Sequence, residues 1–374
     1  MLKNMYWIWV LALLGFMSCA DNDNVGKVER VDLLDFDFPQ GNDPWDKEIE
    51  QIAKDWGMYI IYKDVDSTHL NRRWTTPVET APIYVCTTPS SDDIQVYLQL
   101  VKDWLLSGMD KDNEADREQL PIYLYLVNDF NDGNPKSSSY MKNHIQLKKD
   151  GMDYWSLSFT SEELAAGLTP KMIHGVACSF SYPGMKSRFT TGVYKVAPGF
   201  LEMTDYETRI GTRYCSKEQF LEENPGIPEV WYDENTGICL YEKDPENAYL
   251  RRGFAPQITE TFEVVDREKS LTRGAPTWMP WILQVNKYGV ERDDNPGPVA
   301  ETVEERVIWD FLNVIRMAML WPEEKVREEF PVDAEDPLDR AGFQKINDKY
   351  DLVVEYMKTT YNINLQKYAE ILNE

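Results

Sequence analysis

Apolar residues follow two different spacings along the first half of the chain. Helical spacing begins at Asp43-Pro44 and stops at Gly57, which is typical of a capped helix that ends at a glycine. Ser90 begins a second helix whose apolar face runs to Leu105. Apolar runs predict strands at 58–62, 82–86, 122–127 and 154–159. Strands that alternate with helices in this way indicate helices packed on a mixed sheet.

The segment from Thr169 to Phe180 predicts a further helix, with Thr169 as the N-cap and a proline in the first turn. It carries His174 and Cys178 four residues apart, so both side chains project from one face. One interpretation is a zinc site, because zinc peptidases place two histidines at this spacing. The other is packing, in which the small and apolar residues press against the sheet and His174 is a hydrogen-bonded core residue.

The second half of the chain consists of an irregular segment followed by a segment with helical spacing. Residues 181–300 are irregular and rich in Gly, Pro and aromatic residues, with Trp278 and Trp281 at the densest aromatic spot. These two tryptophans are either a binding surface or part of the core. Helical spacing returns at 307–318 and 343–357, and Asn364 precedes a short last helix.

These patterns predict an α+β fold with one domain over residues 43–374. It divides into a sheet-bearing half at 43–180, an irregular insert at 181–300 and a helical part at 301–374.

The first residues predict export and lipid anchoring. A short basic start with Lys3 precedes an apolar run from Tyr6 to Met17, which is too short to span a bilayer comfortably. The run ends in Ser18-Cys19, which resembles a bacterial lipoprotein processing site. We therefore expect a signal peptide at 1–18, lipid on Cys19 and a flexible acidic tether over 19–42. An ordinary secretory signal and an N-terminal membrane anchor are the alternatives.

Charge and rare residues narrow the classes of function. The formal net charge of −25 argues against nucleic acid and anionic membrane surfaces as partners. The cysteines after the anchor could form two disulfides but are too few for a disulfide scaffold, so a hydrophobic core must hold the fold. They are Cys86, Cys178, Cys215 and Cys239. Besides His174, the chain has only His69 and His144, both in polar surroundings where we expect them to be solvated.

Several segments, taken in order, carry a resemblance to a known family. The family consists of Bacteroidetes lipoproteins classed as zinc-binding metallopeptidases. Its opening is similar to Trp45–Tyr62 of this chain, the segment after its central loop to Arg251–Phe254, and its closing helix to Lys345–Leu365. The acidic residues after Cys19 resemble the export tag of surface-exposed members. The resemblance implies a zincin-like fold, an outer-membrane location facing outward (or the periplasm), and partners in the outer-membrane transport of peptides or glycans.

The sequence departs from that family at both zinc motifs. The family's His-Glu-x-x-His is reduced here to His174, with Gly175 and Cys178 at the other two positions. A later Glu-Asp-Phe-Ala-Glu, which should supply the third ligand, reads Trp309–Asn313. A catalytic zinc needs three protein ligands and a carboxylate for proton transfer, and glycine cannot transfer a proton. Glu304-Glu305, one turn earlier, could substitute only if the helix register shifted.

Three functions follow from these departures. The leading hypothesis is an outer-membrane surface lipoprotein that has lost zinc hydrolysis and acts as a binding or accessory subunit of nutrient uptake, without a cofactor. The alternative is an active zinc metallopeptidase that uses His174, Cys178 and an unidentified carboxylate. A third is a surface module that binds glycan or protein and has no inherited site.

Overall fold

The computed structural model describes residues 36–71, 84–107, 109–131, 146–149, 151, 153–207, 216–223, 225–226, 229, 232–233, 238–239, 248–262, 276, 278 and 302–373. The strands are β1 (Tyr59–Ile61), β2 (Val85–Thr87), β3 (Tyr123–Asn131), β4 (Leu147–Lys148), β5 (Tyr154–Phe159), β6 (Tyr232–Asp233) and β7 (Ile238–Cys239). Helices of the first half are α2 (Pro44–Trp56), α3 (Ser67–Leu70), α4 (Ser91–Leu100), the π-helical turn η2 (Val101–Leu106), α5 (Glu114–Arg117), α6 (Ser161–Ala166) and α7 (Pro170–Thr190). Later helices are η3 (Leu201–Met203), α8 (Lys217–Glu223), α9 (Ala248–Arg251), α11 (Val303–Leu320), α12 (Glu323–Glu329), α13 (Pro337–Tyr361), α14 (Gln366–Glu370) and η6 (Ile371–Asn373).

Strand β3 is the centre of a mixed sheet. Strands β1 and β5 run parallel to it, with Tyr59 and Tyr154 both in register with Tyr123. Strand β2 pairs antiparallel with the end of β3, and β4 pairs antiparallel with β5. The predicted mixed sheet is confirmed, and β5 has the predicted bounds. Strand β3 runs on to Asn131, four residues beyond the predicted end at Val127.

Both faces of β3 are buried, which explains its nearly continuous apolar sequence. On one face its tyrosines, such as Tyr125, pack with α3 and with Phe36. On the other face its leucines, such as Leu124, pack against α2, α4 and α7. The predicted helix at α2 is confirmed together with its stop, because Gly57 ends it in the left-handed conformation at φ 71°.

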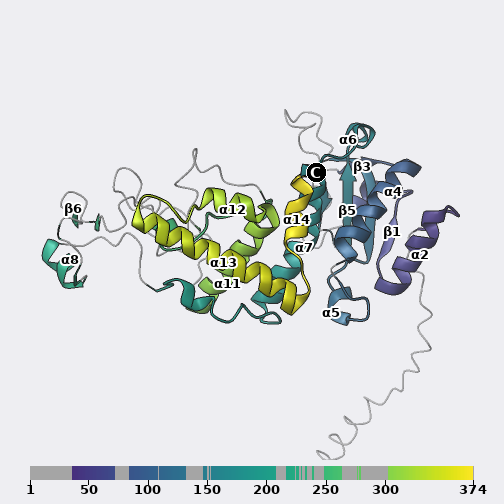
Figure 1. Ribbon diagram of the computed structural model, residues 1–374. Helices are drawn as coiled ribbons and strands as arrows, with labels where there is room; N and C mark the ends of the chain where they lie inside the picture. The colour runs from purple at the N-terminus through teal and green to yellow at the C-terminus, as the bar shows by residue number, and fades with distance from the viewer. Residues whose placement is uncertain are drawn as a thin grey trace, which may run out of the picture.

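Helix α7 connects the sheet to the helical part of the molecule, and Figure 1 shows it between β5 on one side and α11 and α14 on the other. Val176 and Phe180 belong to the core cluster under the sheet, whereas Ala177 and Cys178 belong to the cluster formed with α11 and α13. Thr169 is the N-cap, as predicted, and its side chain accepts from the backbone N–H of Met172. The predicted packing of this helix through its small and apolar residues is confirmed.

The same helix is ten residues longer than predicted, because it continues to Thr190 through Pro183. A proline inside a helix has no N–H, so the carbonyl four residues earlier, that of Ser179, loses its helical partner. Lys149 fills that place, since its Nζ donates to the Ser179 carbonyl at 2.8 Å. A distant side chain thus satisfies the carbonyl that the proline leaves without a partner.

The two predicted C-terminal helices are confirmed as the inner part of α11 and α13. Thr302 and Glu305 form a capping box at the start of α11. Asn362, at φ 55°, ends α13. Asn364 then accepts from the backbone N–H of Gln366, the first residue of α14, at 3.1 Å, although the cap position of that helix is Leu365 rather than the predicted Asn364.

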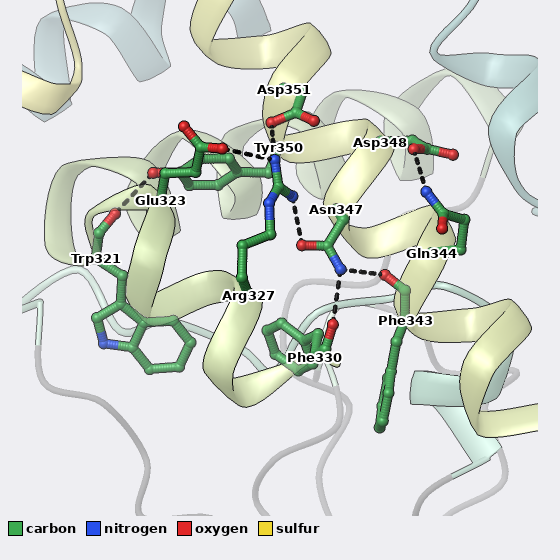
Figure 2. Close-up of polar contacts among 10 residues, drawn as sticks. All are labelled: Trp321, Glu323, Arg327, Phe330, Phe343, Gln344, Asn347, Asp348, Tyr350 and Asp351. Atoms are coloured by element: carbon green, nitrogen blue, oxygen red, sulfur yellow. Dashed lines mark hydrogen bonds and ion pairs between the residues drawn. The ribbon is translucent and has the colours of Figure 1, made fainter. Parts of the chain in front are cut away.

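Helix α12 was not among the predicted elements, and polar contacts tie it to α13 (Figure 2). Arg327 donates to the carboxylate of Asp351 at 2.5 Å and also to the side-chain oxygen of Asn347. The Asn347 amide in turn donates to the carbonyls of Phe330 and Phe343 at 2.8 Å each. One buried asparagine therefore joins the end of α12 to the first turns of α13.

Two expectations from the sequence are wrong, and two of the residues concerned cannot be compared with the structure. His69 is not solvated: it lies in α3, its side chain is 18% exposed, and its ring packs 4.5 Å from that of Phe36. Cys86 and Cys178 are free thiols, which leaves no set of two disulfides among the four cysteines. His144 and Cys215 lie outside the described residues.

The predicted signal peptide at 1–18 and the tether as far as residue 35 also lie outside the described residues. Within the part of the chain that is described, no helix combines the length and apolar character required to cross a bilayer.

Candidate functional site

His174 faces the helical part of the molecule and is 3% exposed. Its Nε2 lies 2.8 Å from the carbonyl oxygen of Met319, in the last turn of α11. Because a carbonyl oxygen only accepts, Nε2 carries the ring proton in the neutral form, and the lone pair is on Nδ1. Burial lowers the pKa of His174, an effect that the bond to Met319 opposes. The side chain is therefore a neutral hydrogen-bond donor at pH 7.

This bond belongs to a set of contacts that satisfies the end of α11. The last carbonyls of a helix have no partner within the helix. Beside the Met319 carbonyl, Gln366 Nε2 donates to the carbonyl of Ala318 at 3.0 Å. The hydroxyl of Tyr350 donates to the carbonyl of Trp321, just beyond the helix, at 2.9 Å (Figure 2). His174 thus acts as one of three side chains that cap this helix end.

Cys178 lies beside His174, and the two side chains together offer only two donors to a metal. Its sulfur is 3.4 Å from His174 Nε2 and the residue is fully buried. Burial raises the pKa of the Cys178 thiol far above its usual value, so in the absence of a metal the thiol is protonated. A Cβ built at Gly175 would meet no atom within 4 Å apart from its chain neighbours and the nearby backbone of its own helix. A side chain could therefore begin there, but the chain does not supply the glutamate.

Within the residues that the structure describes, no third ligand for zinc lies near this pair. Glu305, considered above as a substitute, accepts from the backbone N–H of Thr302 at 3.2 Å, at the opposite end of α11 from Met319. Glu305 and Met319 are 14 positions apart, which corresponds to about 21 Å along the helix axis, whereas zinc ligands lie about 2 Å from the ion. Among the described residues, no three His, Cys, Asp or Glu side chains are grouped to hold a metal. The donors around His174 do not fit zinc.

Asp310, in the second altered motif, is part of a buried ion pair. Its Oδ2 accepts from Lys349 Nζ at 2.6 Å and from the hydroxyl of Tyr206 at 2.7 Å. Lys349 is 1% exposed and also donates to the carbonyl of Gly253 at 2.8 Å. Its ammonium lies 4.6 Å from the ring centre of Phe254. Burial lowers the pKa of Lys349, and Asp310 opposes that shift.

Asn313, where the family has the second glutamate of the motif, binds backbone rather than metal. Its Oδ1 accepts from the backbone N–H of Ile258 at 2.9 Å, and its Nδ2 donates to the carbonyl of Pro256 at 3.0 Å. Arg316 also donates to Asn313 Oδ1, at 3.2 Å. Both ends of the amide are therefore used to hold residues 255–258 against α11.

The sequence-predicted site residues do not meet at one place. His174 and Cys178 adjoin the end of α11, whereas Asp310 and Asn313 bind the segment after α9. Trp278 is 3% exposed and packs in the core cluster near Phe254, which favours the core alternative for it. Cys19 and Trp281 lie outside the described residues.

Lys349 was missed from the sequence, although one signal marked it. It lies three residues after Ile346 and four before Val353, on the apolar face of α13. A lysine on such a face is expected to be buried only if it is paired, and its partner Asp310 is on another helix.

Comparisons with known proteins identify no family for the chain. No protein-family profile and no curated protein matches it. Among solved structures, it is similar to a Bacteroides caccae protein proposed to be a zinc-binding metallo-peptidase. The identity is 13%, the TM-score is 0.38, and the match covers 89% of this chain and 93% of that one. At that TM-score the likeness does not bear on fold or chemistry, so the zincin-like assignment stays a prediction.

Proposed function

We propose that this chain is a non-catalytic binding or accessory protein with a zincin-like architecture. The observation that carries the proposal is the hydrogen bond from His174 Nε2 to the Met319 carbonyl. In a zinc peptidase a histidine at this position would direct a lone pair at the metal. Here the nitrogen that faces α11 carries a proton and holds a helix end.

The second altered motif supports the same proposal. Asp310 is neutralised by Lys349, and the Asn313 amide is occupied by the backbone at 255–258. Both sets of contacts join segments that are far apart in the sequence, so these polar groups are already bound to other parts of the protein. The polar residues of the two motifs therefore form hydrogen bonds and an ion pair that connect α7, α11, α13 and the segment after α9.

We extend the proposal to location and partners from the sequence. The basic start, the short apolar run and Cys19 support a lipoprotein of the outer membrane, facing outward. In that setting the partner would be an outer-membrane transporter that takes up peptides or glycans. This chain would bind the peptide or glycan as an accessory subunit of the transporter. Nuclease-like or nucleic-acid-binding roles are disfavoured by the net charge of −25.

Metal content and hydrolysis test the central part of the proposal. The full chain is purified in mild detergent without chelators, and zinc is measured in the wild type and in His174→Leu. We expect far less than one zinc per chain in both proteins, and no cleavage of unfolded casein by either. One zinc per wild-type chain that is lost in the variant would overturn the proposal in favour of the metallopeptidase.

Lipid labelling tests the location separately. Cells that express the wild type and Cys19→Ala are grown with a labelled fatty acid, and surface exposure is measured with an external protease. We expect label on the wild type alone, and we expect a transporter to be recovered with it after mild solubilisation. Absence of label on the wild-type chain would contradict the proposed lipid anchor at Cys19, and it would not affect the conclusion about zinc.

A further inference from the structure

A cavity of about 350 Å³ lies beside α7, between η2, the β4–β5 edge of the sheet and the turn from α13 to α14. This volume is at the lower end of the range for small-molecule sites. Its apolar wall includes Leu105, Phe180 and Ile363. Among the described residues that line it there is no Asp or Glu, although the chain carries 64 of them. The lining includes three cations instead: Lys149, Arg188 and Lys367.

Lys149 is the most unusual of the three. Its ammonium donates to the Ser179 carbonyl at 2.8 Å and lies 4.3 Å from the ring centre of Trp155. Within the described part of the chain, no carboxylate forms an ion pair with it. Burial alone lowers the pKa of Lys149 to about 8. An ammonium has three N–H donors, and one is used by the Ser179 carbonyl, so the group can still donate to a ligand in the cavity.

Lys367, which is exposed, also lines the cavity and makes the same two kinds of contact. Its Nζ donates to the carbonyl of Asp103 at 3.2 Å and lies 4.3 Å from the ring centre of Trp104. In both cases a backbone carbonyl and an indole ring fix the ammonium in place without cancelling its charge. Arg188 differs, because Asp116 pairs with its guanidinium and the Tyr194 hydroxyl accepts from it at 2.7 Å. The uncompensated charge therefore comes from the two lysines.

At Lys149, desolvating a cation without a counter-ion costs free energy that a bound anion would recover, and the exposed Lys367 adds a second positive charge. We propose that this cavity binds a small organic carboxylate, with the carboxylate at Lys149 and Lys367 and an apolar body against Phe180 and Ile363. A mixed wall of this kind fits an amphipathic acid better than inorganic phosphate, which has no apolar part. The inference rests on the proposed binding function for its biological role and supplies the ligand class which that proposal lacks.

Calorimetric titration of the full chain in mild detergent tests the cavity. The probes are phenylacetate, its uncharged analogue phenylacetamide, and inorganic phosphate. We expect phenylacetate to bind in the micromolar to millimolar range and Lys149→Met to weaken it by about tenfold or more, as loss of a charged partner does. Lys367→Met should weaken it less, and Lys171→Met, at an exposed position on α7 outside the lining of the cavity, should leave it unchanged.

A second measurement on the wild type alone guards against a variant that fails to fold. Reductive methylation followed by mass spectrometry reports how accessible each lysine is. Phenylacetate should protect Lys149 and leave Lys171 unprotected. No binding of phenylacetate, equal binding of phenylacetamide, tighter binding of phosphate, or unprotected Lys149 would each overturn the inference. None of these results depends on zinc, so the inference and the proposed function can fail separately.

Discussion

Lys349 and Lys149 are both ammonium groups withdrawn from water, and burial lowers the pKa of each, yet their surroundings differ. Lys349 meets a carboxylate, a carbonyl and an aromatic ring on three different segments. Lys149 meets a carbonyl and an indole, and it borders a cavity without an acidic residue among its described lining. The first ammonium is paired with a carboxylate of the protein, whereas the second has no such partner among the described residues. Compensation of charge, more than burial, separates a structural lysine from a candidate binding lysine.

The largest effect should come from Lys349→Met. The substitution leaves Asp310 buried without its partner, so we expect a loss of about 3–5 kcal/mol in the free energy of unfolding. Chemical denaturation followed by circular dichroism measures it. The double variant Lys349→Met, Asp310→Leu should recover much of the loss, because it removes both charges. A loss below about 1 kcal/mol in the single variant would contradict the role given to this pair.

Close approach of α9 to α13 predicts the next largest effect. A Cβ at Gly342 would lie 2.1 Å from the carbonyl oxygen of Leu250, which is backbone and cannot turn aside. We expect Gly342→Ala to cost about 1–3 kcal/mol or more, as overpacking does. Gly175→Ala is the matched control: it is also inside a helix but has open space, so it should gain about 0.5–1 kcal/mol. Equal changes in thermal unfolding for Gly342→Ala and Gly175→Ala would contradict the close contact between α9 and α13.

Loss of the helix cap should have an intermediate effect. His174→Leu removes the donor to the Met319 carbonyl and should cost about 1–3 kcal/mol at pH 7. The pKa of His174 is lowered in the folded state, so the unfolded chain takes up the proton first as the pH falls below its own pKa of about 6.5. The wild type therefore loses this stabilisation between pH 6.5 and the folded pKa, and its advantage over His174→Leu should shrink. Denaturation at pH 7 and pH 5.5 measures the gap, and a constant or growing gap would contradict the neutral donor.

Lys149→Met should change stability least. It removes a donor from the Ser179 carbonyl but also removes a desolvated charge, so we expect a net change within about 1 kcal/mol in the free energy of unfolding. The informative quantity is the difference between the losses in the free energy of unfolding of Lys149→Met and Lys349→Met, both measured by chemical denaturation. A loss as large as that of Lys349→Met would mean that Lys149 is structural too.

Local patterns predicted much of the fold. Gly57, Thr169 and the run at 122–127 each determine an element through short-range chemistry, and the structure places the elements where these residues indicate. The continuation of α7 past Pro183 could not be predicted in this way. The Ser179 carbonyl that the proline leaves without a helical partner accepts from Lys149, which is 30 residues away in the sequence.

The candidate site was predictable only in part. The paired changes at His174 to Cys178 and at Trp309 to Asn313 indicated that zinc chemistry was lost. The new roles of these residues involve Met319 and the backbone at 255–258, which no sequence spacing connects to them. The cavity was missed for the same reason, because its cations come from three distant segments.

The most direct test of the central claim is the protonation state of His174, because its Nε2 cannot both donate to a carbonyl and bind zinc. The chain has three histidines, so ¹⁵N-histidine labelling gives a spectrum in which His174→Leu assigns the signal. We predict a neutral ring at pH 7 with the proton on Nε2, unchanged when zinc is added. A proton on Nδ1 instead, with an Nε2 signal that shifts on addition of one equivalent of zinc, would contradict the account and restore the metal site.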